Sequence, residues 1–117
     1  DTRSYQIALH AARAYDARLH VLTVAPELQR NLYVYDSEKH WGEKLREFLA
    51  AYPPGEVAHE TKVLKGSAHR QIVRHAEAIG ADLIVMTAAN PRIQDYLLGT
   101  TASHVVTHAT CSVYVVR

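Results

Sequence analysis

The chain has 117 residues, 48% hydrophobic and 21% charged, and its 13 Lys and Arg against 12 Asp and Glu leave a net charge of +1. This composition is typical of a single globular domain over residues 1–117, and the near balance of scattered charges disfavours nucleic acid as the main partner. The one cysteine, Cys111, has no intrachain partner, and no apolar run reaches the roughly 20 residues that cross a bilayer, so we expect a cytoplasmic protein without a membrane partner.

The first half of the chain predicts two helices and two strands in alternation. Apolar residues recur at helical spacing from Ser4 to Tyr15, and they alternate with polar ones from Arg18 to Val24. Residues 27–36 show no clear period and predict a loop. A helix with one apolar face follows from Ser37 to Tyr52, and the polar middle of Val57–Leu64 predicts a strand near a sheet edge.

The second half repeats this alternation. Ser67 is placed to cap a helix that ends at Ile79, with Gly80 in the left-handed conformation beyond it. The uninterrupted apolar run Leu83–Met86 predicts a strand buried on both faces. The remaining elements are a loop over 87–98, a helix over Thr100–His108 and a strand over Ser112–Val116.

Alternating helices and strands predict an α/β fold with a parallel sheet and right-handed crossovers. A domain of this class normally begins with a strand, whereas this sequence begins with a helix. We therefore expect that one strand of the sheet is missing from the supplied chain.

In open parallel sheets, ligands bind beyond the carboxyl ends of the strands. The most informative such place runs from Met86, which closes the apolar strand, to Gly99, Thr100 and Thr101, which open the last helix. Backbone N–H groups and the positive end of the helix dipole favour an anion there. The pattern alone equally fits a plain helix cap, so it indicates a phosphate site without fixing one.

Three motifs in the last third of the chain occur in the order of a known family. The apolar strand ends at Met86, Leu97-Leu98-Gly99-Thr100 precedes the helix, and Cys111-Ser112-Val113 opens the final strand. In this the segment 81–117 closely resembles the C-terminal third of the universal stress protein family. The segment 7–26 is similar to the family's first helix and second strand. The segment 63–79 is similar to its third strand and third helix. The resemblance implies a three-layer sandwich with a parallel five-stranded sheet, of which the central first strand is absent here.

The resemblance also implies ATP, with or without Mg²⁺, as the ligand. By correspondence, Val24 lies beside adenine, Met86 and Thr87 lie at the end of the fourth family strand, and the segment Gly99 to Thr101 surrounds the phosphates. Arg92 is our addition, as a loop cation that neutralises a phosphate; the alternative is a solvated surface arginine, which is the commoner case. The Gly-x-x-Gly of many ATP-binding members is absent, and the loop with Asn90-Pro91-Arg92 resembles a shorter, glycine-poor subset in which Thr87 replaces the first glycine.

The final strand suggests a second role. Its residues are Val113, Tyr114, Val115 and Val116. This apolar edge has no following element to cover it, and family members form homodimers there. We find no nucleophilic serine turn and no paired carboxylates, and His104 and His108, four residues apart, are expected to be a solvated pair. The sequence therefore predicts an ATP-binding dimeric stress regulator without catalytic or metal residues; the alternatives are a nucleotide-free dimeric interaction module and a slow ATP hydrolase.

Overall fold

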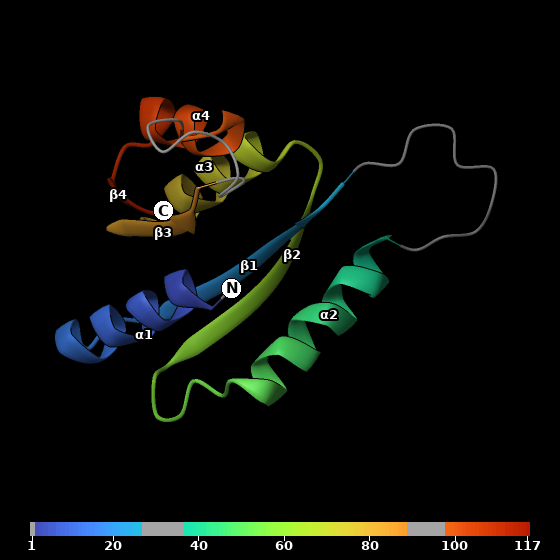
Figure 1. Cartoon of the computed structure of the whole chain (residues 1–117), viewed down its shortest axis with the longest axis vertical. Helices are drawn as coiled ribbons and strands as arrows, with labels where there is room; N and C mark the ends of the chain where they lie inside the picture. The colour runs from blue at the N-terminus through green and yellow to red at the C-terminus, as the bar shows by residue number, and fades with distance from the viewer. Residues whose placement is uncertain (1, 27–36, 89–97) are drawn as a thin grey trace.

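A computed structural model describes residues 2–26, 37–88 and 98–117. In these ranges helices and strands alternate in the predicted order (Figure 1). The helices are α1 (Arg3–Tyr15), α2 (Ser37–Ala51), α3 (Ala68–Ile79) and α4 (Thr100–His108). The strands are β1 (Leu19–Ala25), β2 (His59–Lys65), β3 (Leu83–Thr87) and β4 (Ser112–Val116). The α/β class is confirmed, and no described helix is long and apolar enough to cross a membrane.

The described strands form two parallel pairs. β1 pairs with β2, with Leu19 opposite His59, and β3 pairs with β4, with Leu83 opposite Ser112. Among the described residues no hydrogen-bond ladder joins the two pairs, so the structure shows two two-stranded sheets and not a single five-stranded one. The edges of β1 and β3 that face away from their partners therefore carry no strand in the described part of the chain.

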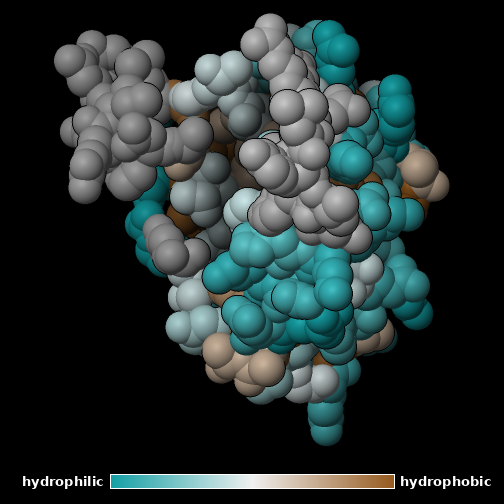
Figure 2. All heavy atoms as spheres, turned by 90° about the vertical axis from the view of Figure 1, so that its right-hand side faces the viewer, coloured by the Kyte–Doolittle hydropathy of each residue, from teal (hydrophilic) through white to brown (hydrophobic). Residues whose placement is uncertain are grey.

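The helices form layers on either side of the strands, with α1 and α2 on one side and α3 and α4 on the other (Figure 1). α1 packs against β1, β3 and β4, so this helix bridges the two strand pairs. The described core lies beneath α1, where Tyr5, Leu9, Ala12 and Val57 are buried. Leu19, Val21, Phe48 and Leu49, on β1 and α2, pack against it. The face toward α2 is mostly hydrophilic, with hydrophobic atoms visible in a recess (Figure 2).

One local prediction is wrong: Leu83 is 41% exposed and the rest of β3 is half-buried, because β3 has a described partner along only one edge. Ser67 is the N-cap residue of α3, as predicted, but its side chain makes no cap hydrogen bond; its Oγ lies 3.4 Å from Nδ1 of His69. The predicted stop at Gly80 is confirmed: φ is 64°, and its N–H donates to the carbonyl groups of Ala76 and Glu77.

Candidate functional site

The carboxyl end of β1 is hydrogen-bonded to the turn that precedes α3. The Gly66 N–H donates to the Ala25 carbonyl at 3.1 Å, and Ala25 has no exposed surface. Gly66 has φ 121°, a region that side chains other than glycine rarely adopt, and an added Cβ would lie 3.4 Å from the Gln71 side chain. Val24, the predicted adenine neighbour, is half-buried and directly precedes Ala25.

The carboxyl end of β3 is tied to both β4 and α1. The Ala88 N–H donates to the Val116 carbonyl at 2.8 Å. The Thr87 hydroxyl donates to Ser4 Oγ at 2.9 Å, so the first turn of α1 reaches the end of β3. Met86 and Thr87 are both half-buried. Sequence reasoning missed Ser4 as a neighbour of the site, since its only signal was a hydroxyl at the start of a helix.

The start of α4 carries the third group of predicted residues. Gly99, its N-cap, has φ 87° and ψ 163°, a combination that is essentially restricted to glycine. The Gly99 carbonyl accepts the Ser103 N–H at 3.0 Å, and no described side chain caps the helix. Thr101 is half-buried and Ala102 is fully buried, which anchors this first turn. The first-turn N–H groups are thus left without a side-chain cap, which is the arrangement that helix N-termini use for anions.

The predicted site residues therefore lie on three segments. Val24 belongs to one strand pair, whereas Met86 and Thr87 belong to the other, and the segment Gly99 to Thr101 begins α4. α1 connects the two pairs through its packing on β1 and β3. Arg92 and the rest of the loop over 89–97 lie outside the described residues. None of the described candidates is ionisable, so binding at this rim would rest on backbone dipoles and hydroxyl groups.

A separate cavity, which sequence reasoning did not identify, opens between β1, β2 and α3. Its volume is about 580 Å³, and none of the predicted site residues lines it. Its walls are His20, Leu22, His59, Glu60, Thr61, Lys62, His75 and Ile79. The Glu60 carboxylate contacts Arg18 and His20, each at 3.4 Å, although 57% of its side chain is exposed. No described group of three or more His, Cys, Asp or Glu residues is arranged to hold a metal ion.

Comparisons with known proteins agree on one family. The model of the universal stress protein family matches residues 2–117. Universal stress protein G of Shigella flexneri is 32% identical over 106 residues, which cover 85% of this chain and 75% of that protein. Universal stress protein G of Salmonella typhimurium is 43% identical over 58 residues, which cover 50% of this chain and 41% of that protein.

Solved structures show the same fold. A universal stress protein from Archaeoglobus fulgidus superposes with a TM-score of 0.77 at 19% identity, covering 98% of this chain and 87% of that one. A universal stress protein in complex with cAMP superposes with a TM-score of 0.74 at 24% identity, over the same shares of the two chains. With a family model that spans nearly every residue and a relative matched along most of its length, this chain belongs to the universal stress protein family.

Proposed function

We propose that this protein is a cytoplasmic stress-response regulator that binds ATP at the carboxyl ends of β1 and β3. The observation that carries this proposal is the start of α4, where Gly99 holds a glycine-only conformation and leaves the first turn without a side-chain cap. A phosphate chain satisfies such N–H groups and interacts favourably with the helix dipole. The family member solved with cAMP supports an adenine nucleotide as the ligand class.

Within this proposal, each candidate residue has a role that follows from its position. Val24 supplies apolar contact for adenine from the end of β1, and Met86 and Thr87 line the opposite side from the end of β3. The segment Gly99 to Thr101 receives the phosphates, and Arg92 neutralises one of them. Because the described residues form no metal-ligand cluster, Mg²⁺ would be carried mainly by the phosphates themselves.

We propose further that the complete sheet has five strands. The free edges of β1 and β3 are where a central strand would pair, and its backbone groups would satisfy both ladders. The free edge of β4 would then be the outer edge of this sheet. Tyr114 is 49% exposed there, and pairing of two β4 strands about a two-fold axis would form a homodimer.

Isothermal titration with ATP tests the nucleotide site through two glycine variants. Gly99→Val places a side chain where the phosphates approach the backbone, so we expect affinity to fall at least tenfold, or by about 1.4 kcal/mol. Gly55→Val is the matched control: Gly55 also has a positive φ, of 66°, and a Cβ there meets nothing within 4 Å. Wild-type affinity in Gly99→Val would refute the site, whereas equal losses in both variants would point to general destabilisation.

One observation favours a second candidate, a nucleotide-free dimeric interaction module. Thr87 replaces a family glycine, and its hydroxyl already donates to Ser4, so the backbone at this position is more encumbered than at a glycine. The absence of binding heat at millimolar ATP, with dimerisation retained, would support this candidate over ATP binding. Steady phosphate release that Thr100→Ala abolishes would instead support a slow ATP hydrolase.

A further inference from the structure

Helix α3 is held on two sides by contacts that involve histidine. One side packs on β1 and β2, and another packs on α4. His75 lies on the first side and His69 on the second. Basic groups outnumber acidic groups around both histidines, so a positive charge on either imidazole ring would weaken the contact that the ring makes.

His75 has no partner for a proton on its inner nitrogen. Its Nε2 is buried and makes no hydrogen bond to any described residue. The His75 ring lies edge-on to the His20 ring, with centroids 6.1 Å apart. β2 contributes His59, Glu60 and Lys62 to the cavity that His75 lines.

Glu60 is the acidic group among these neighbours, and it is already engaged. Its carboxylate contacts Arg18 and, on the other oxygen, His20. A protonated His75 would therefore be repelled by the Lys62 ammonium. The Glu60 carboxylate, which could offset that charge, is already shared between Arg18 and His20. Protonation also requires solvation of a nitrogen that is now sealed from water, which is costly in a low-dielectric setting.

The second contact joins α3 to α4 through stacked rings. The centroids of His69 and His104 are 4.1 Å apart with the planes tilted by 33°, and His108 lies 6.2 Å from His104. Arg70 is the nearest charged neighbour on α3 itself, and α4 has no acidic residue. Ser67 Oγ, 3.4 Å from His69 Nδ1, is a weak neutral partner. A positive charge on His69 would therefore lie against the His104 ring and beside Arg70, with no acidic residue of α4 to offset it across the α3–α4 interface.

Neither group is better explained as a ligand site. No described set of three or more ligands is placed to hold a metal, and the acidic wall of the cavity already has its own partners. We propose that α3 is an acid-sensitive element, which loosens from β1, β2 and α4 when His75 and His69 become protonated, while α1 and its core stay folded.

The direction of the titration agrees with this proposal. Burial, aided by Lys62 and His20, lowers the pKa of His75, and Glu60 opposes this only in part. Burial, followed by His104, Arg70 and His108, lowers the pKa of His69. The His75 and His69 rings bind a proton more tightly when α3 is loosened than when it is packed. The packed state is therefore fully favoured above pH about 6.5, the ordinary histidine value, and it loses stability as the pH falls below that value.

Amide hydrogen exchange of the ligand-free protein at pH 7.5, 6.5 and 5.5, expressed as protection factors, tests this directly. Between its ordinary pKa and its lower pKa in packed α3, each histidine can lower the protection factors by up to tenfold per pH unit. We expect the protection of α3 to fall from pH 7.5 to 5.5, by up to tenfold per pH unit for each histidine, and to fall by more than that of α1. His75→Gln and His69→Gln should each reduce this pH slope.

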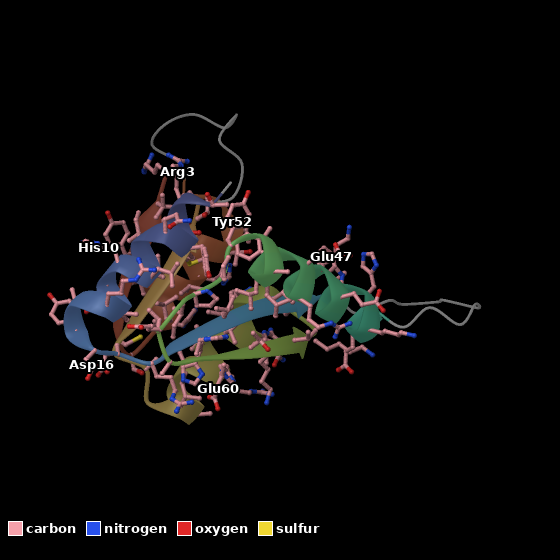
Figure 3. The ribbon with its side chains drawn as sticks, turned by 90° about the horizontal axis from the view of Figure 1, so that it is seen from below. Arg3, His10, Asp16, Glu47, Tyr52 and Glu60 are labelled. Atoms are coloured by element: carbon pink, nitrogen blue, oxygen red, sulfur yellow. The ribbon has the colours of Figure 1, made fainter. Side chains whose placement is uncertain are left out.

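His10→Gln is the matched control, because His10 is exposed and points outward from α1 (Figure 3). It should leave the slope unchanged. Protection of α3 that holds or rises at pH 5.5 would overturn the proposal, since it would mean that Glu60 turns to pair with protonated His75. The same slope in both glutamine variants as in the wild type would also overturn it. Should one variant fail to fold, the wild-type profile and the other variant still decide the matter.

Discussion

The hydroxyl of Tyr5 joins the two helices over the described core, and removing it has a calculable effect. Tyr5 on α1 is 8% exposed, and its hydroxyl donates at 2.6 Å to the carbonyl of Tyr52, just beyond the end of α2. The Tyr5 ring also meets the Phe48 ring edge-on, with centroids 5.0 Å apart and planes at 78°. Tyr5→Phe removes the hydrogen bond alone, because the ring and its contact with Phe48 remain.

The magnitude follows from what the substitution leaves behind. A net hydrogen bond contributes about 0.5–1.5 kcal/mol, and an acceptor left unsatisfied in a buried place costs about 1–3 kcal/mol. Tyr52 itself is 43% exposed, so water reaches this region and the lower range applies. We expect a loss of about 1 kcal/mol, which for a chain of this length lowers Tm by about 4 °C.

Urea unfolding of Tyr5→Phe and of Tyr5→Leu separates the hydrogen bond from the ring contact. Tyr5→Leu should lose about 0.5–1.5 kcal/mol more than Tyr5→Phe, because it also removes the aromatic pair with Phe48. The slope of free energy against urea should stay constant, since the surface exposed on unfolding is the same. Stability equal to wild type in Tyr5→Phe would refute the reasoning.

The Tyr5→Phe variant should also change how stability depends on pH. Burial raises the pKa of Tyr5, although Arg13 acts in the opposite direction. The packed protein therefore holds the phenolic proton more tightly than the unfolded chain, so this contribution to stability is fully present below pH 10.0, the ordinary tyrosine value, and is lost as pH rises through the raised pKa. Tyr5→Phe should reduce this alkaline loss, and an unchanged alkaline profile would contradict the assigned cause.

Three further outcomes are expected. Leu9→Ala should cost about 2–5 kcal/mol in urea unfolding, because Leu9 is 3% exposed and its removal leaves a cavity; a loss below 1 kcal/mol would refute its place in the core. Glu60→Gln should cost no more than about 1 kcal/mol, because the Glu60 side chain is 57% exposed; a larger loss would mean that its contacts with Arg18 and His20 support the fold. Tyr114→Lys should halve the mass seen in sedimentation without unfolding the monomer, and Tyr114 suits this test better than the half-buried Val115; an unchanged mass would contradict the interface.

Local pattern was sufficient to place the helices and strands. Helical periodicity identified α1 and α3, and the glycine after α3 ended it where the sequence predicts. β2 begins at His59 and not at Val57, because the Val57 N–H donates to the Pro54 carbonyl at 3.4 Å, in the turn that precedes the strand. Periodicity reports how apolar residues recur but does not report which of them belong to a turn.

Contacts between distant segments were beyond the reach of the sequence. Nothing in the pattern pairs Thr87 with Ser4, 83 residues away, or brings His69 of α3 against His104 of α4. The burial of β3 was overestimated for the same reason, since an apolar run shows what a strand can bury and not how many neighbours cover it. The start of α4 could be predicted, because a glycine before hydroxyl residues marks a helix start locally, whereas the role of these residues as a phosphate site stays a prediction.

Contact between nucleotide phosphates and the first turn of α4 is measured most directly by an ATP titration followed through the backbone amide resonances of the isotopically labelled protein. We expect the largest and saturable shifts at Gly99, Thr100 and Thr101, with smaller ones at Val24 and Thr87. Saturable shifts confined to the cavity of His20 and His75, with the α4 resonances unmoved, would contradict it.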